Sequence, residues 1–391
     1  MHGEGRKGNL ALFSNLWAEG LAASMATAPR VAIIGVGRTP ARGRTGDLSY
    51  RELIYDAAVR AYADAGIAHT EVDVFVSCAE DMIEGTSICD EYTPDQLGAV
   101  MKPVHTITGD GILGLATGVM QIQSGVAEIC AVEARSKASN VLTLPAIHQY
   151  ALDPVWERHI DAHPLFLAGL EMQYLLSREG PTDRDCAEVV VNNRRHGLRN
   201  PWAPYGANLT LDEVLASPPV ADPLKALEVA PYSDGAAVIV LASESRTAHT
   251  PHAPVWVRGT GWASDSPTVA TRDWDTPRAA QLAARMALDE SGVALDTLDV
   301  IEVDDTYAYK QLQHLDAVGL GSSHGAVNRS GGALSLGNLL EASGAYRVCE
   351  LVDQLRGRAE GRQVLDARRG LALSWRGLPT TSYACCILEA A

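Results

Sequence analysis

The strongest constraint on the fold is a pattern that the chain carries twice, 226 residues apart. Around Gly66 the sequence reads DAGIAHTEVDVFV, and around Gly292 it reads ESGVALDTLDVIE. Each copy predicts the end of a helix, a glycine that stops it, a short acidic loop and an apolar strand. Upstream of each copy lies a matching strand that ends in Gly-x-Gly, at 31–37 and 255–261. The repeat is much longer than a solenoid unit of ~20–50 residues, so it predicts a duplicated α/β half-domain.

Along the chain, apolar strands alternate with amphipathic helices, which predicts an α/β fold. The expected strands lie at 31–35, 72–76, 104–107, 129–132, 236–241 and 383–388, and the expected helices lie at 50–65, 112–123 and 165–176. This alternation is typical of mostly parallel sheets that helices cover on both faces.

The composition changes between 140 and 215, where Pro, His, Trp and Arg accumulate and the alternation stops. We therefore expect an inserted loop domain at 140–215. It separates an N-terminal half, made of 25–139 and 216–245, from a C-terminal half at 246–391. Residues 1–24 differ again: Glu19 interrupts their apolar stretch, so we expect a disordered leader rather than a signal peptide.

Composition argues against several classes of protein. The formal charge of −16 disfavours binding to nucleic acid. No apolar run approaches the ~20 residues that span a membrane, so no membrane association is expected. The seven cysteines form no Cys-x-x-Cys pair and have no zinc-ligand spacing. We therefore expect reduced thiols, a cytoplasmic location and no metal site.

Several motifs follow one another between 200 and 345. They are Asn-Pro-Trp-Ala at 200–203 with Thr-Leu-Asp-Glu-Val at 210–214, Ala-Asp-Pro-Leu at 221–224, Ser-Asp-Gly-Ala-Ala at 233–237, Ser-Gly-Gly-Ala at 330–333, and Gly337 followed by Ala-Ser-Gly-Ala at 342–345. With the duplication, they resemble the thiolase superfamily, in particular the branch of the sterol-carrier-protein thiolases. The last two resemble that branch's G-G … G-H-P-x-G-A-T-G-A segment. The resemblance covers 31–391 and implies an α/β thiolase fold of two duplicated halves, an inserted loop domain, and a dimer as the smallest unit.

The resemblance also implies a specific chemistry. In the family, a cysteine at the N-terminus of a buried helix takes an acyl group from coenzyme A, because the helix dipole favours the thiolate. The G-H-P histidine activates that cysteine, and a histidine or asparagine of an H-D-x-F or N-E-x-F motif binds the enolate oxygen. A late cysteine or histidine moves the α-proton. A coenzyme A thioester is then the substrate, and no tightly bound cofactor is expected.

Each of these catalytic positions is substituted in this chain. Thr108 aligns with the cysteine, and its hydroxyl is far less acidic than a thiol. Asp304 aligns with the histidine of H-D-x-F, where a carboxylate would repel an enolate. Asn338 aligns with the G-H-P histidine; it can donate a hydrogen bond but cannot act as a base. The late position falls at 373–376, which holds neither cysteine nor histidine.

The remaining cysteines do not restore the nucleophile. Cys385 and Cys386 lie inside a predicted strand, so one would face each side of a sheet as a small buried apolar side chain. Cys78 and Cys89 do not open a predicted helix. We expect structural roles for all four.

Asp304, Asp305 and Tyr307 form the most suggestive group. They follow a predicted strand, and open α/β sheets place their sites beyond the carboxyl ends of strands. Crowded carboxylates raise each other's pKa and can supply an acid or a base, with a tyrosine as proton donor. Alternatively, the aspartates cap the start of a helix. We favour capping for Asp305 and a functional role for Asp304.

A basic cluster of Arg194, Arg195 and His196 stands out in this acidic chain. Arginine suits phosphate, and the resemblance places the inserted domain against the pantetheine and phosphates of coenzyme A. A solvated helix face is an equally good interpretation. Asp110 and Ser335, within the aligned motif segments, complete the predicted substrate contacts.

Two functions remain open. In the first, the chain is a non-classical subunit of an acyltransferase complex that handles acyl-CoA. The resemblance implies partners for it: a second copy, a cysteine-bearing thiolase, or a small OB-fold zinc-ribbon protein. In the second, the chain is a cysteine-independent aldol lyase that uses Asp304, Asp305 or Tyr307, as some thiolase-like proteins of sterol side-chain breakdown use tyrosine.

Overall fold

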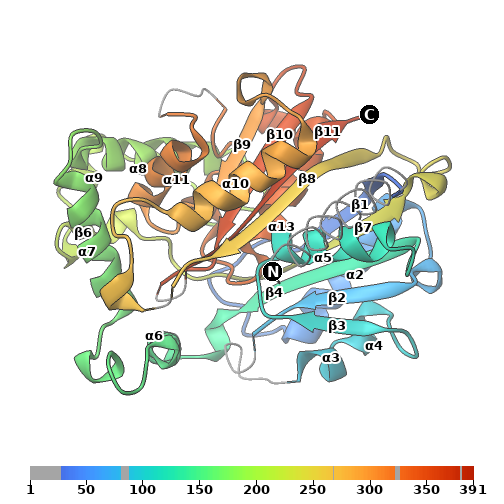
Figure 1. The fold of residues 1–391 in the computed structure, drawn as a ribbon, viewed down its shortest axis with the longest axis horizontal. Helices are drawn as coiled ribbons and strands as arrows, with labels where there is room; N and C mark the ends of the chain where they lie inside the picture. Colours follow the sequence, from blue (N-terminus) through green and yellow to red (C-terminus); the bar gives the residue numbers. More distant parts are fainter. Residues whose placement is uncertain (1–27, 81–87, 267, 322–325, 379–380) are drawn as a thin grey trace, which may run out of the picture.

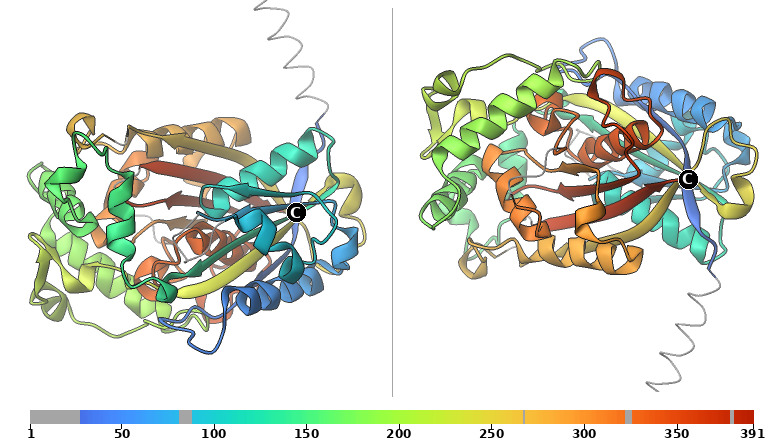
Figure 2. Two further views of the ribbon diagram at one scale, coloured as in Figure 1. Left: turned by 90° about the horizontal axis from the view of Figure 1, so that it is seen from below. Right: turned by 90° about the horizontal axis from the view of Figure 1, so that it is seen from above.

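The computed structural model describes residues 28–80, 88–266, 268–321, 326–378 and 381–391. The leader expected at 1–24 lies outside these residues. The described chain forms two α/β halves side by side and a third lobe, drawn in green (Figure 1). The lobe lies at the end of the molecule away from the C-terminus in every view (Figure 2).

The elements of the two halves follow in chain order. The N-terminal half contains β1 (Val31–Arg38), α2 (Tyr50–Ala65), β2 (Val74–Cys78), α3 (Cys89–Tyr92), α4 (Pro94–Leu97), β3 (Val104–Ile107), α5 (Gly111–Gln123), β4 (Ile129–Lys137) and β7 (Asp234–Ser243). The C-terminal half contains β8 (Val255–Ser264), α10 (Arg278–Ser291), β9 (Val300–Val303), α11 (Ala308–Val318), α12 (Gly332–Leu336), α13 (Ala342–Leu355), β10 (Arg369–Trp375) and β11 (Ser382–Ala390).

The strand order repeats the duplication seen in the sequence. The sheet runs β3-β2-β4-β7-β1 through the N-terminal half and continues β8-β11-β10-β9 through the other. β2 and β4 are parallel, as are β9 and β10, while the next pairs in both halves are antiparallel. In the first half, β3 pairs in parallel with β2. At the equivalent place in the second half, Ile301 of β9 forms a single parallel bridge to Val327. The predicted duplication is therefore present, but the sheet is mixed rather than mostly parallel. A short connection joins β10 to β11, and such a connection permits only antiparallel pairing.

The repeated Gly-x-Gly motifs let a helix approach a strand closely. A Cβ atom on Gly37 would lie 2.2 Å from the carbonyl oxygen of Ala57 in α2. A Cβ atom on Gly261 would lie 2.1 Å from the carbonyl oxygen of Ala283 in α10. Each half thus uses glycine for the same reason, because only glycine leaves room for this contact.

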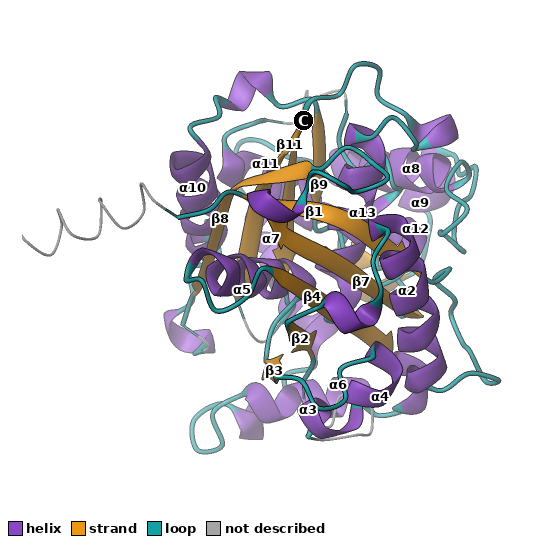
Figure 3. Cartoon of the chain, turned by 90° about the vertical axis from the view of Figure 1, so that its right-hand side faces the viewer, coloured by secondary structure: helices purple, strands orange, loops and turns teal. Residues whose placement is uncertain are grey.

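The three largest apolar cores of the described residues lie between the layers of the molecule. One packs α2 against the outer face of the N-terminal strands, and another packs α10 and α11 against the outer face of the C-terminal strands. The third encloses α5 and α13 between the two halves. Figure 3 shows the strands in the middle of the molecule with helices around them. Cys385 and Cys386 face different cores, as their adjacent positions in a strand predicted.

The lobe contributes two long helices and several short elements. They are α6 (Leu144–His148), α7 (Pro164–Leu176), α8 (Asp183–Gly197), α9 (Leu211–Leu215), β5 (Pro219–Ala221) and β6 (Leu224–Lys225). Only α7 was predicted. α8 begins with a capping box formed by Thr182 and Asp185, a signal that the sequence contains and that the composition of this region obscured. The domain boundaries drawn from the sequence stay a prediction.

Candidate functional site

A cavity of about 580 Å³ lies where the lobe meets both halves. We call it the central cavity. Its described lining includes Tyr232, Tyr307, Asn338, Trp375 and Arg376, with His148 from α6 and two carboxylates, Glu80 and Glu341. It therefore contains three of the positions that the sequence comparison singled out: Tyr307, Asn338 and the late segment at 375–376.

The two tyrosines supply neutral donors to the central cavity. Tyr307 immediately precedes α11 and is only 7% exposed, with its ring 5.9 Å from Tyr309 and 6.0 Å from Trp375 between centroids. Burial raises the pKa of Tyr307 far above its ordinary value, and it raises the pKa of Tyr232 to about 12. Both phenols therefore keep their protons at neutral pH and can donate hydrogen bonds.

Asn338 is held rigidly by its backbone. Its N–H donates to Pro231 at 2.7 Å, and its carbonyl accepts from the N–H of Ser233 at 3.0 Å. Its side-chain oxygen accepts from the N–H of Leu340 at 3.0 Å. That contact fixes the carboxamide, so its NH₂ group is the part that can donate to a bound molecule.

Asp304 and Asp305 do not line the central cavity. Asp304 is 1% exposed; it accepts from Arg347 at 2.7 Å and from the N–H of Thr306 at 2.9 Å. Asp305 is fully buried and accepts from the N–H groups of Ala333 and Leu334 in the first turn of α12. The prediction of a reactive Asp304 is corrected, because Arg347 neutralises it inside the protein. Asp305 does cap a helix, but the helix is α12 rather than the one that follows it.

Thr108 does not open the helix at which a nucleophile was expected. α5 begins at Gly111 with Asp110 as its N-cap, so the exposed Thr108 lies two residues before the cap. Asp110 accepts from the N–H of Ile112 at 2.8 Å, from the N–H of Gly344 at 2.6 Å and from the hydroxyl of Ser374. Burial raises the pKa of the Asp110 carboxyl. Asp110 thus ties α5 to α13 and β10 and does not contact the central cavity.

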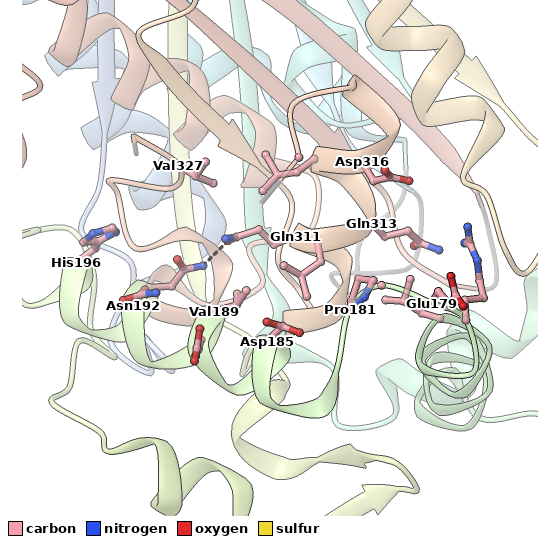
Figure 4. A pocket seen from close by; sticks show the side chains of 18 of the residues that line it. Glu179, Pro181, Asp185, Val189, Asn192, His196, Gln311, Gln313, Asp316 and Val327 are labelled. Carbon is pink, nitrogen blue, oxygen red and sulfur yellow. Dashed lines mark hydrogen bonds between the residues drawn. The ribbon is translucent and has the colours of Figure 1, made fainter. Parts of the chain in front are cut away.

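The predicted coenzyme A contacts of α8 also lie elsewhere. Arg195 and His196 line a second pocket of about 820 Å³, in which α8 (green) faces α11 (orange) (Figure 4). Arg194 is buried and donates to the carbonyl of Tyr205 at 3.0 Å. Ser335 is buried and donates to the carbonyl of Asn193 at 2.9 Å. None of these four residues is part of the central cavity's described lining.

No thiol lines the described part of the central cavity. All seven cysteines fall within the described residues, and all are buried. Burial raises the pKa of Cys78 and Cys385 well above the ordinary thiol value and that of Cys349 to about 12. None of these three forms a thiolate at neutral pH, so none is a ready nucleophile.

A cation and two carboxylates form a cluster that the sequence reasoning missed. Arg376 forms an ion pair with Glu80, lies 3.4 Å from a carboxylate oxygen of Glu341, and donates to the carbonyl of Thr108 at 3.4 Å. Burial lowers the pKa of Arg376 to about 10, which leaves it charged at neutral pH. One signal was available: Glu341 stands where the aligned G-H-P-x-G motif has glycine.

The described residues contain no group of three or more His, Cys, Asp or Glu side chains arranged to hold a metal ion. Within the same parts of the chain, no helix is long and apolar enough to cross a membrane.

Comparisons with known proteins place this geometry in context. A family model described as "Thiolase, C-terminal domain" matches residues 263–370. The acetyl-CoA acetyltransferase of Methanothermobacter thermautotrophicus is 29% identical over 367 residues, which cover 87% of this chain and 94% of that protein. Sterol carrier protein 2 of Homo sapiens is 28% identical over 401 residues, covering 88% of this chain and 70% of that protein.

Solved structures share the fold. A structure described as an Ltp2-ChsH2(DUF35) aldolase matches with a TM-score of 0.79 at 22% identity, covering 92% of this chain and 98% of that chain. The acetyl-CoA acetyltransferase of Bacillus anthracis matches with a TM-score of 0.75 at 18% identity, covering 93% and 99%. These likenesses confirm the predicted α/β fold of two duplicated halves.

Proposed function

Because this chain belongs to the thiolase superfamily, in the branch like the sterol-carrier-protein thiolases, we propose that it makes or breaks a carbon–carbon bond beside a coenzyme A thioester without an acyl-cysteine. Relatives named acetyl-CoA acetyltransferase support chemistry on acyl-CoA in general terms. The cysteine-independent route goes beyond what the names of these relatives say.

One observation carries this proposal. The central cavity combines neutral hydrogen-bond donors with carboxylates, and no thiol is among its described lining residues. Donors that lie where negative charge develops are the most effective means of stabilising an enolate. A thiolase reaction needs a thiolate instead, and no cysteine is among the described lining residues of the central cavity.

The reaction that fits these groups is the retro-aldol cleavage of a β-hydroxyacyl thioester. A base takes the proton of the β-hydroxyl, the Cα–Cβ bond breaks, and its electron pair forms the thioester enolate. The hydroxyl carbon leaves as an aldehyde or ketone, and a proton returned to the α-carbon completes the shortened acyl thioester. Tyr307 and Asn338 would donate to the thioester oxygen. A solved structure with this fold is described as an aldolase, so the fold accommodates that class of chemistry.

The test is a pair of assays on the purified chain. We expect a β-hydroxyacyl-CoA to be cleaved to an acyl-CoA and a carbonyl compound, and acetoacetyl-CoA not to undergo thiolysis. Cleavage should survive pretreatment with iodoacetamide under native conditions. Rapid thiolysis that iodoacetamide abolishes would contradict the proposal.

A second candidate is a subunit of an acyltransferase complex that is inactive alone. Exposed apolar side chains on the lobe favour a partner: Leu142, Tyr150 and Trp156 are 96%, 72% and 75% exposed, and Tyr150 reaches the central cavity. The partner would be a second copy, a cysteine-bearing thiolase or an OB-fold zinc-ribbon protein. Turnover that occurs only after such a partner is added would favour this candidate. We also propose a cytoplasmic location, which fits cysteines that form no disulfide in the described residues.

A further inference from the structure

We propose that Glu341 is the group that takes and returns the proton in the central cavity, and that Arg376 positions it. This inference rests on the proposed carbon–carbon cleavage and assigns the base that the reaction requires. It depends on where the Glu341 side chain lies and on what surrounds it.

The backbone of Glu341 is fixed between the two central helices. Glu341 immediately precedes α13, and its carbonyl oxygen accepts from the N–H of Gly111, the first residue of α5, at 2.9 Å. Its side chain is 4% exposed and lines the central cavity, as does Asn338. A carboxylate anchored in this way meets a substrate in one geometry, as proton transfer requires.

The Glu341 carboxylate does not serve the helix that it precedes. An acidic residue at an N-cap ordinarily accepts from the free N–H groups of the first turn. Glu341 has helical backbone angles, φ −63° and ψ −22°, and makes no such side-chain bond to α13. Its oxygen lies beside the Arg376 guanidinium instead. The aligned motif has glycine at this position, so the carboxylate is an addition to the cavity wall rather than part of the helix start.

The other groups that face the central cavity are weaker bases for this step. Tyr232 and Tyr307 have pKa values above the ordinary phenol value, so both stay protonated at neutral pH, which suits them as donors. Burial and the neighbouring His163 lower the pKa of His148, so its imidazole is a poor proton acceptor. Glu80 has a side chain that is 38% exposed and an ion pair with the same guanidinium, so water competes for its proton. Of the two carboxylates in the described lining of the central cavity, Glu341 is the enclosed one, and it shares that lining with the donors.

Arg376 fixes the position of the Glu341 carboxylate through their contact. Its guanidinium lies between Glu80 and Glu341 and also donates to the carbonyl of Thr108, so it joins loops from both halves. Arg376 is thus a positioning residue, because it acts through Glu341.

The step balances with these groups alone. The Glu341 carboxylate accepts the proton of the substrate β-hydroxyl as the new carbonyl forms. The Cα–Cβ bond breaks, and its electrons move into the enolate whose oxygen accepts from Tyr307 and Asn338. The Glu341 carboxylic acid then gives the same proton to the α-carbon, which regenerates the carboxylate. No oxidant, reductant or further reactant is consumed.

The test compares Glu341→Gln with wild type in the β-hydroxyacyl-CoA cleavage assay. General acid–base catalysis contributes about 10²–10⁴-fold, so kcat should fall by that factor while KM changes less than about threefold. The acid limb of the pH–kcat profile should disappear, because Gln cannot ionise. The matched control is Glu128→Gln, an exposed carboxylate outside the cavity lining, which should keep wild-type kcat.

Arg376→Lys should lower kcat about tenfold and shift the acid limb of the pH–kcat profile, a change that a purely structural role would not produce.

If Glu341→Gln is unfolded by circular dichroism, Glu341→Asp decides, because it keeps the charge but withdraws it by one methylene. It should retain the fold and lose at least tenfold in kcat. Full activity in either folded Glu341 variant would overturn the assignment. Absence of cleavage by the wild-type chain would instead remove the proposed function itself.

Discussion

Two sets of acidic residues each meet an arginine, and the structure gives them opposite roles. Asp304 and Asp305 are adjacent in sequence, fully enclosed, and matched by Arg347 and by the N-terminus of α12. Glu80 and Glu341 are 261 residues apart and meet at Arg376 on the wall of a cavity. The difference shows that adjacent carboxylates do not make a site. What decides is whether the surrounding protein has already neutralised them.

The largest effect should come from removing the cation of the enclosed pair. Arg347→Met leaves Asp304 buried without its partner, which destabilises a protein by about 3–5 kcal/mol. Urea unfolding followed by circular dichroism measures this loss. A free energy of unfolding within 1 kcal/mol of wild type would mean that water reaches Asp304. The two sets of acidic residues would then not differ in how well they are enclosed.

Tyr307→Phe should lower activity rather than stability, the opposite of what Arg347→Met should do. Loss of one donor to a developing oxyanion costs about 10²–10³-fold in kcat, because the enolate loses a hydrogen bond. The free energy of unfolding should change by less than about 1 kcal/mol, since the phenyl ring preserves the packing. Steady-state kinetics and urea unfolding of the same preparation test both. Unchanged kcat would remove Tyr307 from the reaction.

The stability of the protein should also depend on pH through Asp305. Burial raises the pKa of Asp305 to about 6, above its unfolded value near 3.9, so the native state binds this proton more tightly. The contribution of Asp305 to stability therefore falls as the pH rises from about 4 to 6. Asp305→Asn removes this pH-dependent contribution. The free energy of unfolding of the variant, relative to that of wild type, should therefore rise by about 2 kcal/mol between pH 4 and pH 7. A difference that does not vary with pH would show that Arg347 keeps Asp305 ionised throughout.

The smallest effect should come from the basic cluster. Arg195 lines the second pocket and pairs with Asn192, away from the central cavity. Arg195→Ala should change KM for the thioester less than about twofold, measured beside wild type at the same ionic strength. A tenfold rise in KM would restore the phosphate-binding role that the sequence indicated.

The architecture was predictable from sequence because it depends on features that lie close together along the chain. The helix that Gly66 stops, the Gly-x-Gly strand ends and the strand with Cys385 and Cys386 all depend on neighbouring residues. α8 was missed even though its capping box was present, and the mixed strand directions depended on how each connection crosses the sheet.

The site was only partly predictable. Motif positions singled out Tyr307 and Asn338 as candidates, and both line the central cavity together with Trp375 and Arg376 of the late segment. The neutralising partner of Asp304 lies 43 residues further along the chain, and Glu80 meets Arg376 across nearly 300 residues. A pattern of neighbouring residues in the sequence cannot predict ion pairs between residues so far apart along the chain. Glu341 did carry a local signal, since a carboxylate replaces a glycine of the aligned motif.

The most direct test of cysteine-independent chemistry is intact-protein mass spectrometry of the wild-type chain, acid-quenched while it is cleaving a β-hydroxyacyl-CoA. Our account predicts the unmodified mass of the chain at every time point, because the enolate is held by hydrogen bonds and no thioester forms on the protein. A transient increase equal to the mass of the acyl group, carried by a cysteine or by Thr108, would contradict it.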